Sequence, residues 1–383
     1  MLKKYKKEFI FSILFFFLLS SLKALPISTT AKYALIVDYD TESILYEKEA
    51  DAKIFPASMS KLMTLYILFE SISNGTVSLD DEFLVSKKAW KKGGSKMFLE
   101  PNSKVKVKDL IKGIIVQSGN DACIVVAEAL SGDEDSFAKL MNIKANNLGL
   151  RNSNFINSTG WPDADHYMTS NDLAKLSIRI IKDFPEFFHM FKEKEYTYNN
   201  IEQNNRNPLL FSYNFSDGLK TGYTEDSGYS LAATAKKNNK RVILILSGME
   251  SKKERKKESI KLFEWAFREY TNVSLFKKDE AIIEADVWLG KKAIVELYSK
   301  KDVLFTIHKK DLRKFQALVS YNSPIPAPIK ENVEYAKLVI TNTVNGNLEY
   351  SLFAKNKIEK AGIFKKLTSA LSYLIFGGYA EKE

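Results

Sequence analysis

Residues 56–64 read Pro-Ala-Ser-Met-Ser-Lys-Leu-Met-Thr, and this stretch decides how the rest of the chain is interpreted. Apolar residues recur at helical spacing from Met59 to Phe69, which predicts a helix beginning here. On a helix, three-residue spacing puts the Ser58 hydroxyl and the Lys61 amine on one face, within reach of each other. A serine beside an amine is a nucleophile beside a base, provided that burial or another cation lowers the pKa of the lysine. The spacing alone is weak evidence, because it also begins at four other serines: Ser20, Ser103, Ser136 and Ser274.

A second polar triplet, Ser118-Gly119-Asn120, precedes an apolar stretch at helical spacing. Its hydroxyl could relay a proton, and its amide could hold a substrate carbonyl or Lys61. The alternative is a helix N-cap, the more common role of serine at such a position. Ser-x-Asn also occurs at Ser212 and Ser320, so the triplet alone does not choose between these roles.

A third triplet, Lys220-Thr221-Gly222, occurs once and directly precedes a strand pattern. A cation here would keep Lys61 neutral, Thr221 could bind a carboxylate, and Gly222 would let another backbone approach closely. Taken alone, the triplet also fits a turn. The three motifs in this order along one chain are typical of penicillin-binding proteins and class A β-lactamases.

Longer blocks around each motif resemble the D-alanyl-D-alanine carboxypeptidases, which are low-molecular-mass penicillin-binding proteins. The resemblance rests on residues 56–64, 117–122 and 217–224, and it extends to 94–98, 137–142, 155–160, 166–173 and 206–207. It covers most of residues 30–270. Weaker similarity at 287–290 and 327–329 suggests the small β-domain that follows the catalytic domain in this family.

The resemblance implies a role for each motif residue. Ser58 would be acylated by a peptidoglycan stem peptide with loss of the terminal D-alanine, and Lys61 would be the general base. Ser118 and Asn120 would complete the proton path and hold the substrate. The main-chain N–H groups of Ser58 and Tyr223 would form the oxyanion hole. The family uses no cofactor and no metal, and β-lactams trap the serine covalently.

The third motif would bind the substrate. Lys220 would tune the electrostatic field, and Thr221 with Arg206 would hold the terminal carboxylate by charge-assisted hydrogen bonds. Gly222 and Tyr223 would complete the substrate-binding edge. Many relatives carry histidine at the position of Tyr223, which leaves the effect of its side chain on deacylation open.

Two other features of the sequence bear on the site. Asn102 stands where relatives often have glycine, and asparagine tolerates a left-handed turn better than any residue except glycine. The histidines fit neither a Ser-His-Asp order nor a metal cluster and are interpreted as structural: His166, His189 and His308. Cys123, the only cysteine, lies in an apolar stretch and is interpreted as a buried small residue.

Periodicity predicts an α+β fold in which helices pack on an antiparallel sheet, as in the β-lactamase and transpeptidase-like proteins. Strands are predicted at 33–46, 228–235 and 241–248, and helices at 59–69, 110–132, 171–182 and 251–270. Shorter strands at 282–289, 293–297, 303–308 and 336–341 predict the small all-β domain. The lysine-rich run from Lys252 to Lys257, Arg255 included, is interpreted as a solvated helix face.

The predicted organisation has four parts. Lysines before the apolar stretch 9–19 predict a signal peptide over 1–24. The catalytic domain would span 25–275 and the β-domain 276–357. Residues 358–383 would form an amphipathic helix lying in a membrane surface, although a helix packed on its own domain is nearly as plausible. The protein is thus expected to be exported to the periplasmic face of the inner membrane.

The formal charge of +10 suits an anionic partner, but the scattered lysines argue against nucleic acid.

The leading hypothesis is a serine D-Ala-D-Ala carboxypeptidase acting in cell wall biogenesis. A D,D-endopeptidase cutting cross-links would use the same site. A class A β-lactamase is disfavoured by the appended β-domain and tail. An inactive peptidoglycan-binding homologue is disfavoured because binding does not require a pair of lysines around a serine.

Overall fold

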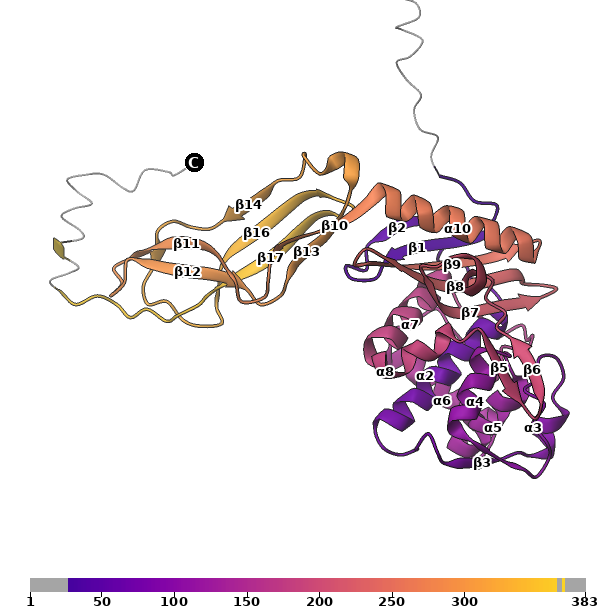
Figure 1. Cartoon of the computed structure of the whole chain (residues 1–383). Coiled ribbons are helices and arrows are strands. Elements are labelled where there is room, and N and C mark those ends of the chain that lie inside the picture. The colour runs from indigo at the N-terminus through magenta and orange to yellow at the C-terminus, as the bar shows by residue number, and fades with distance from the viewer. Residues whose placement is uncertain (1–26, 364–366, 369–383) are drawn as a thin grey trace, which may run out of the picture. The chain divides into compact units, whose positions relative to one another are not determined.

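The structure is a computed structural model, and it describes residues 27–363, 367 and 368 (Figure 1). All the helices and strands named below lie between Tyr33 and Ala354. The predicted signal peptide and most of the predicted terminal helix lie outside the described residues. The predicted start of that helix at residue 358 is wrong, because Ile358 is buried and forms a β-bridge with Ile329, and Lys360 forms one with Gly290. Within the described part, no helix is both long and apolar enough to cross a membrane.

The first folded part is built on a five-stranded antiparallel sheet with the order β2-β1-β9-β8-β7. The central strands carry long runs of buried aliphatic residues because both faces of the sheet are covered. Figure 1 shows α10 on one face and the other helices on the opposite face. The strands are β1 Tyr33–Asp38, β2 Ile44–Lys48, β7 Ser216–Thr224, β8 Gly228–Lys237 and β9 Lys240–Met249. Strand β7 is an edge strand, so one side of its backbone is open to a partner.

The helical layer surrounds α2, whose residues from Lys61 to Phe69 are all buried. A helix that is buried all round must be apolar all round, and Lys61 is the one charged exception in this stretch. The main helices are α2 Lys61–Ser73, α4 Val107–Ile115, α5 Asn120–Ser131, α6 Glu134–Asn147, α7 Ser170–Asp183 and α10 Lys252–Glu269. The short elements are η1 Ala57–Ser60, β3 Glu82–Leu84, α3 Lys87–Lys91, β4 Lys104–Lys106, α8 Pro185–Phe188, η2 His189–Lys192, β5 Glu195–Tyr198, β6 Ile201–Asn204 and α9 Leu209–Ser212.

The single helix predicted over 110–132 is wrong. The chain forms α4 and α5 with a break between them, because Ser118 has a φ of 59° in the left-handed region, which no right-handed helix can contain. The apolar periodicity continues across the break, and this hid it from the sequence. The break brings Ser118 to a corner just before α5.

The second folded part is all β, as predicted. Strands β10 Tyr270–Phe276 and β13 Val303–His308 pair with each other, and a six-stranded sheet has the order β14-β16-β17-β12-β11-β15. Alternate residues such as Phe305, Ile307 and Leu338 form its own buried core. The remaining elements are β11 Ala281–Trp288, β12 Ile294–Ser299, η3 Lys309–Asp311, β14 Ala317–Ser320, β15 Ile325–Pro326, β16 Glu334–Thr343 and β17 Gly346–Ala354. The predicted α+β class with a small β-domain is therefore confirmed.

Candidate active site

Ser58 and Lys61 meet where η1 runs into α2. The Nζ of Lys61 lies 2.8 Å from the Oγ of Ser58 and donates a hydrogen bond of 2.6 Å to the carbonyl oxygen of Thr159. Lys61 has no solvent-exposed surface. Burial, the largest influence, and the nearby charge of Arg206 lower the pKa of Lys61 to about 8. A substantial fraction of this amine is therefore neutral near physiological pH, as a general base requires.

Two glycines let other segments approach the serine closely. A Cβ on Gly160 would lie 1.8 Å from the carbonyl oxygen of Ala57, and a Cβ on Gly222 would lie 2.8 Å from that of Pro56. No side chain fits at either distance. The predicted close approach at Gly222 is present, and it brings β7 against the nucleophile. The turn considered for Lys220-Thr221-Gly222 is wrong, because all three residues lie inside β7.

Ser118 and Asn120 lie where α5 begins. The Oγ of Ser118 is buried and has no hydrogen-bond partner among the described residues. The N-cap alternative for Ser118 is wrong, because Gly119 occupies the N-cap of α5 and no side chain caps it. Asn120 donates from Nδ2 to the carbonyl of Gly93 at 2.9 Å. An unpartnered buried hydroxyl is costly, so Ser118 is suited to a partner that arrives with the reaction.

Lys220 is as deeply buried as Lys61. Its Nζ donates to the carbonyl of Thr221 at 3.3 Å. Burial lowers the pKa of Lys220 well below 10.5, and the charges of Lys61 and Arg206 lower it further. The sequence suggested a fixed cation beside a neutral amine. Because both amines are desolvated and their charges repel, a proton on Lys61 disfavours a proton on Lys220.

Arg206 and Thr221 lie near the two lysines, and in the described part of the chain no hydrogen bond joins Arg206 to Thr221. The Nη1 of Arg206 donates to the Oγ of Ser95, and Thr221 is buried on β7. Arg255 supports Arg206 from α10 by donating from Nη2 to its main-chain carbonyl at 3.4 Å. Arg255 also donates to the carbonyl of Ser230 at 3.2 Å.

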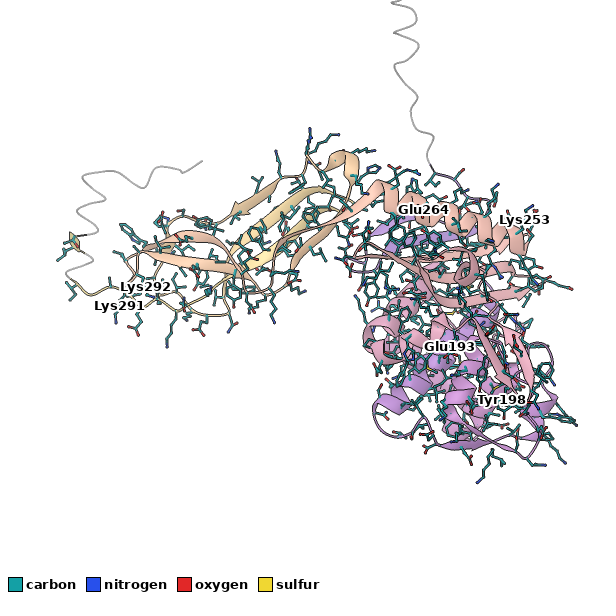
Figure 2. The ribbon with its side chains drawn as sticks, in the orientation of Figure 1. Glu193, Tyr198, Lys253, Glu264, Lys291 and Lys292 are labelled. Carbon is teal, nitrogen blue, oxygen red and sulfur yellow. The ribbon has the colours of Figure 1, made fainter. Side chains whose placement is uncertain are left out.

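The interpretation of residues 252–257 as a wholly solvated face is therefore wrong for Arg255, which is 4% exposed. Lys253 and its neighbours Lys252, Lys256 and Lys257 are exposed, as predicted (Figure 2). Helical spacing was the signal that could have separated Arg255 from them, because Ser259 and Leu262 continue its face and are buried.

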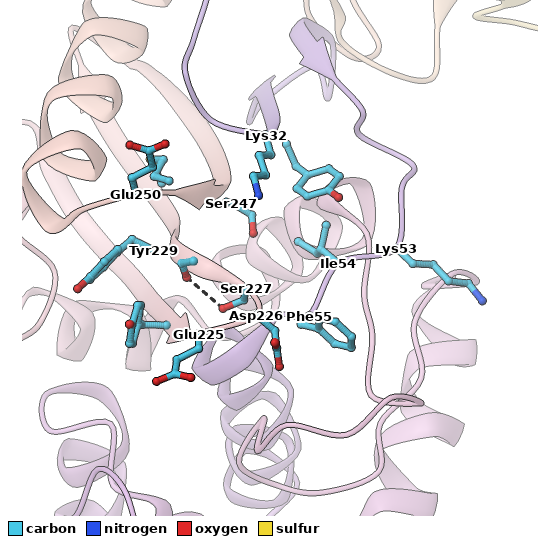
Figure 3. A pocket seen from close by; sticks show the side chains of 15 residues that line it. Lys32, Lys53, Ile54, Phe55, Glu225, Asp226, Ser227, Tyr229, Ser247 and Glu250 are labelled. Atoms are coloured by element: carbon cyan, nitrogen blue, oxygen red, sulfur yellow. Dashed lines mark hydrogen bonds between the residues drawn. The ribbon is translucent and has the colours of Figure 1, made fainter.

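Tyr223 follows the third motif and is 52% exposed, with its ring 4.3 Å from that of Tyr229. Beside it, a cavity of about 410 Å³ lies at the ends of β7, β8 and β9 (Figure 3). A second cavity of about 300 Å³ is lined by Ala57, next to the nucleophile, and shares Phe55 and Asp226 with the first. Ser58 itself lines neither of these two cavities.

Two further expectations are confirmed, and a buried carboxylate was missed. Cys123 is buried, and burial raises the pKa of its thiol to about 12, so it is unreactive. Asn102 has a φ of 64°, in the left-handed region. The carboxylate is that of Asp121, and it accepts from the main-chain N–H groups of Met97 at 2.8 Å and Leu99 at 3.2 Å. It fixes the segment that faces Asn120.

Comparison with known proteins identifies the family. Residues 21–251 match D-alanyl-D-alanine carboxypeptidase, and residues 270–360 match the penicillin-binding protein 5 C-terminal domain. The D-alanyl-D-alanine carboxypeptidase DacC of Escherichia coli is 35% identical over 348 residues, which are 89% of this chain and 87% of that protein. DacF of Bacillus subtilis is 34% identical over 337 residues, 87% of each chain. A D-alanyl-D-alanine endopeptidase of Escherichia coli matches less, with 30% identity over 56% of this chain and 69% of its own length.

Solved structures agree. Penicillin binding protein 5 from Haemophilus influenzae superposes with a TM-score of 0.81 at 32% identity, covering 88% of this chain and all of that one. Similarity of this extent in sequence and in both folded parts leaves no other family to consider. The chain belongs to the D-alanyl-D-alanine carboxypeptidases and is a serine peptidase of the penicillin-binding class.

Proposed function

We propose that Ser58 removes the terminal D-alanine from peptidoglycan stem pentapeptides through an acyl-enzyme. The observation that carries this proposal is the buried amine of Lys61, 2.8 Å from the Ser58 hydroxyl and with its pKa lowered to about 8. In the first step, the oxygen of Ser58 bonds to the carbonyl carbon of the penultimate residue, and its proton passes to Lys61. The peptide bond then breaks, and the leaving D-alanine amine takes up a proton. Water hydrolyses the ester in the second step.

The hydrogen bonds of Lys61 support its role as the base. A neutral amine has two N–H groups and one lone pair. One N–H donates to the carbonyl of Thr159 at 2.6 Å, which leaves the lone pair free to accept the proton of Ser58. The buried, unpartnered hydroxyl of Ser118 is available to pass a proton on to the leaving group.

Strand β7 supplies the binding edge. Because it ends the sheet, a stem peptide can add to it as a further strand, with main-chain hydrogen bonds giving affinity. Thr221 and Arg206 would bind the terminal carboxylate, and the N–H groups of Ser58 and Tyr223 would stabilise the oxyanion. Asn120 would hold the substrate from the start of α5, and Gly222 keeps β7 close to the serine. Such donors typically contribute about 3 to 4 kcal/mol each to transition-state stabilisation.

Two alternatives use the same site. A D,D-endopeptidase would cleave cross-links with the same residues, and the shorter match to an endopeptidase makes it the second candidate. A non-catalytic peptidoglycan-binding protein is disfavoured, because burying the amines of Lys61 and Lys220 costs free energy that binding does not require.

Mass spectrometry of the purified protein tests these functions. The native protein and Ser58→Ala are exposed to penicillin, to a D-Ala-D-Ala pentapeptide and to a cross-linked dimer. A penicillin adduct on the Ser58 peptide with release of one alanine from the pentapeptide supports the carboxypeptidase. Cleavage of the dimer alone supports the endopeptidase. Absence of any adduct on the native protein would leave only the binding function.

We also propose that the protein is exported and acts at the periplasmic face of the inner membrane, held there by residues 358–383. Support comes from the charged and apolar pattern of 1–24 and from the apolar face of the terminal segment. Deletion of residues 358–383 is expected to move the protein from the membrane to the soluble fraction. If the shortened protein sediments with membranes as fully as the native one, the tail is not the anchor.

A further inference from the structure

His166 is a buried imidazole whose two nitrogens are both engaged. Its Nδ1 accepts from the main-chain N–H of Ile156 at 3.2 Å, and its Nε2 lies 2.8 Å from the Oγ of Ser60. Since Nδ1 accepts, the proton of the neutral ring is on Nε2, which therefore donates to Ser60. The ring also packs edge-on against Phe155, with 5.6 Å between ring centroids. This tautomer and orientation are fixed from three sides.

The two partners of His166 belong to the two segments that together position the base. Ser60 lies between Ser58 and Lys61 in the nucleophile turn. Ile156 opens the segment 156–166, hereafter the 156–166 loop, which contains the carbonyl of Thr159 that accepts from Lys61. One imidazole thus links the turn that carries the serine and lysine to the loop that orients the lysine.

Other anchors of the loop do not make this link. The carboxylate of Glu134 accepts from the hydroxyl and the main-chain N–H of Ser158, at 2.9 Å and 3.3 Å, and Thr64 donates to the carbonyl of Ser158 at 2.7 Å. These bonds hold the loop to α6 and to the body of α2. Within the described residues, the bond from His166 to Ser60 is the one side-chain hydrogen bond between the loop and residues 57–60.

We propose that His166 is a positioning residue for the base: by joining Ser60 to the 156–166 loop, it holds the carbonyl of Thr159 against Lys61 so that the lone pair of the amine faces Ser58. The proposal rests on the proposed function in one respect, namely that Lys61 is the base. His166 touches neither Ser58 nor Lys61 by a hydrogen bond, so it acts through Ser60 and Thr159.

His166 makes both of its hydrogen bonds, to Ser60 and to Ile156, only while the ring is neutral. A second proton on Nδ1 would point at the N–H of Ile156 and remove its acceptor. Burial, the largest influence, lowers the pKa of His166 to about 4; of the charged groups that face it, Asp163 raises the value and Lys61 lowers it. The ring therefore stays neutral across the pH range in which Lys61 titrates, and the two effects are separable by experiment.

Two substitutions each keep one of the two hydrogen bonds of the ring and remove the other. In His166→Asn, the amide oxygen takes the place of Nδ1, which keeps an acceptor for Ile156 but loses Ser60. In His166→Gln, the amide nitrogen reaches the place of Nε2, which keeps a donor for Ser60 but loses Ile156. Ser60→Ala removes the same bond as His166→Asn from the other side, without any change to the ring.

The experiment measures the second-order rate of acylation by penicillin as a function of pH, with thermal unfolding in parallel. His166→Asn and Ser60→Ala are expected to slow acylation about 10- to 100-fold, because a small displacement of a catalytic group costs that much. The rising limb of the pH profile is expected to move to higher pH, since a loosened loop admits water to Lys61. His166→Gln is expected to lose less, and the double variant His166→Asn with Ser60→Ala no more than the worse single variant.

Native acylation rates and an unmoved pH limb in His166→Asn, whatever its melting temperature, would overturn the positioning role. If that variant does not fold, Ser60→Ala decides alone, and native acylation by it overturns the proposal equally. Additive losses in the double variant would also contradict a shared bond. Lys61→Met separates this failure from failure of the proposed function: if Lys61→Met is acylated as fast as the native protein, Lys61 is not the base and both proposals fail.

Discussion

The two folded parts of the chain differ in whether their described residues include buried charged side chains. The part built on strands β1 to β9 encloses the ammonium groups of Lys61 and Lys220 and the guanidinium of Arg255, each at most 4% exposed. In the described residues from 270 onward, the buried polar side chains are uncharged: Ser299, Thr306 and Thr343. A fold alone gains little from a desolvated cation, so the difference separates the part that performs chemistry from the part that only folds.

The largest test of this contrast is Lys61→Met. Acylation is expected to fall about 10²- to 10⁴-fold, which is the usual contribution of a general base. Stability is not expected to fall with it, since a lysine whose pKa is held about 2.5 units low costs about 3 kcal/mol at neutral pH. Penicillin acylation and thermal unfolding at pH 7 measure the two effects. Equal losses of activity and stability would show that Lys61 supports the fold rather than the reaction.

The next largest effect is expected from alanine substitutions at two glycines that have nearly the same φ. Gly160 has a φ of 74° and Gly346 a φ of 78°. A Cβ on Gly160 would collide with the carbonyl of Ala57 beside the nucleophile, whereas a Cβ on Gly346 would meet no other atom within 4 Å beyond its chain neighbours. Gly346→Ala is expected to cost only the backbone strain, about 1 to 2 kcal/mol. Gly160→Ala is expected to cost more and to slow acylation as well.

Chemical denaturation and penicillin acylation of both variants check this prediction, and Gly346→Ala is the matched control for backbone strain. If the two variants lose the same free energy and both keep native acylation, the close approach of Gly160 to Ala57 has no functional importance.

The acylation rate and the folding stability are both expected to depend on pH through Lys61. Because Lys61 acts as the neutral amine and its pKa is about 8, acylation is expected to rise about tenfold per pH unit up to pH 8 and then to level off. The unfolded lysine keeps its ordinary pKa near 10.5 and binds more protons between pH 8 and 10.5, so folding stability rises with pH across that window. Rate profiles and denaturation of the native protein and Lys61→Met measure both. A profile that is flat from pH 6 to 9 would contradict a titrating base.

How far the sequence anticipates this site depends on whether a contact involves a side chain in a motif or a main-chain atom. The order of Ser58, Ser118 and Lys220 predicted which segments meet, and apolar periodicity predicted the sheet and most helices. The carbonyl of Thr159 could not be predicted, because every residue has a carbonyl and only long-range packing selects this one. The left-handed φ of Ser118 was hidden for the same reason: the apolar pattern continues through the break between α4 and α5.

Other errors had a signal that was overlooked. Arg255 was grouped with its basic neighbours by composition, although its helical position matches the buried face of α10. His166 was correctly separated from a catalytic triad, but sequence gave no indication that both its nitrogens connect parts of the site. Charge and residue type were therefore poorer guides than periodicity wherever a polar group is buried.

The smallest expected effect comes from a charge in the second folded part. Lys337 and Glu349 face each other on neighbouring strands β16 and β17, with 3.1 Å between Nζ and Oε2, and both are more than half exposed. Solvent screens such a pair, so Lys337→Met is expected to leave both stability and acylation close to those of the native protein. The same substitution at Lys61 removes a charge that solvent cannot screen. Denaturation and acylation of the Lys337 variant at low and high salt test the comparison, and a loss of acylation would mean that charge in the β-domain contributes to the reaction after all.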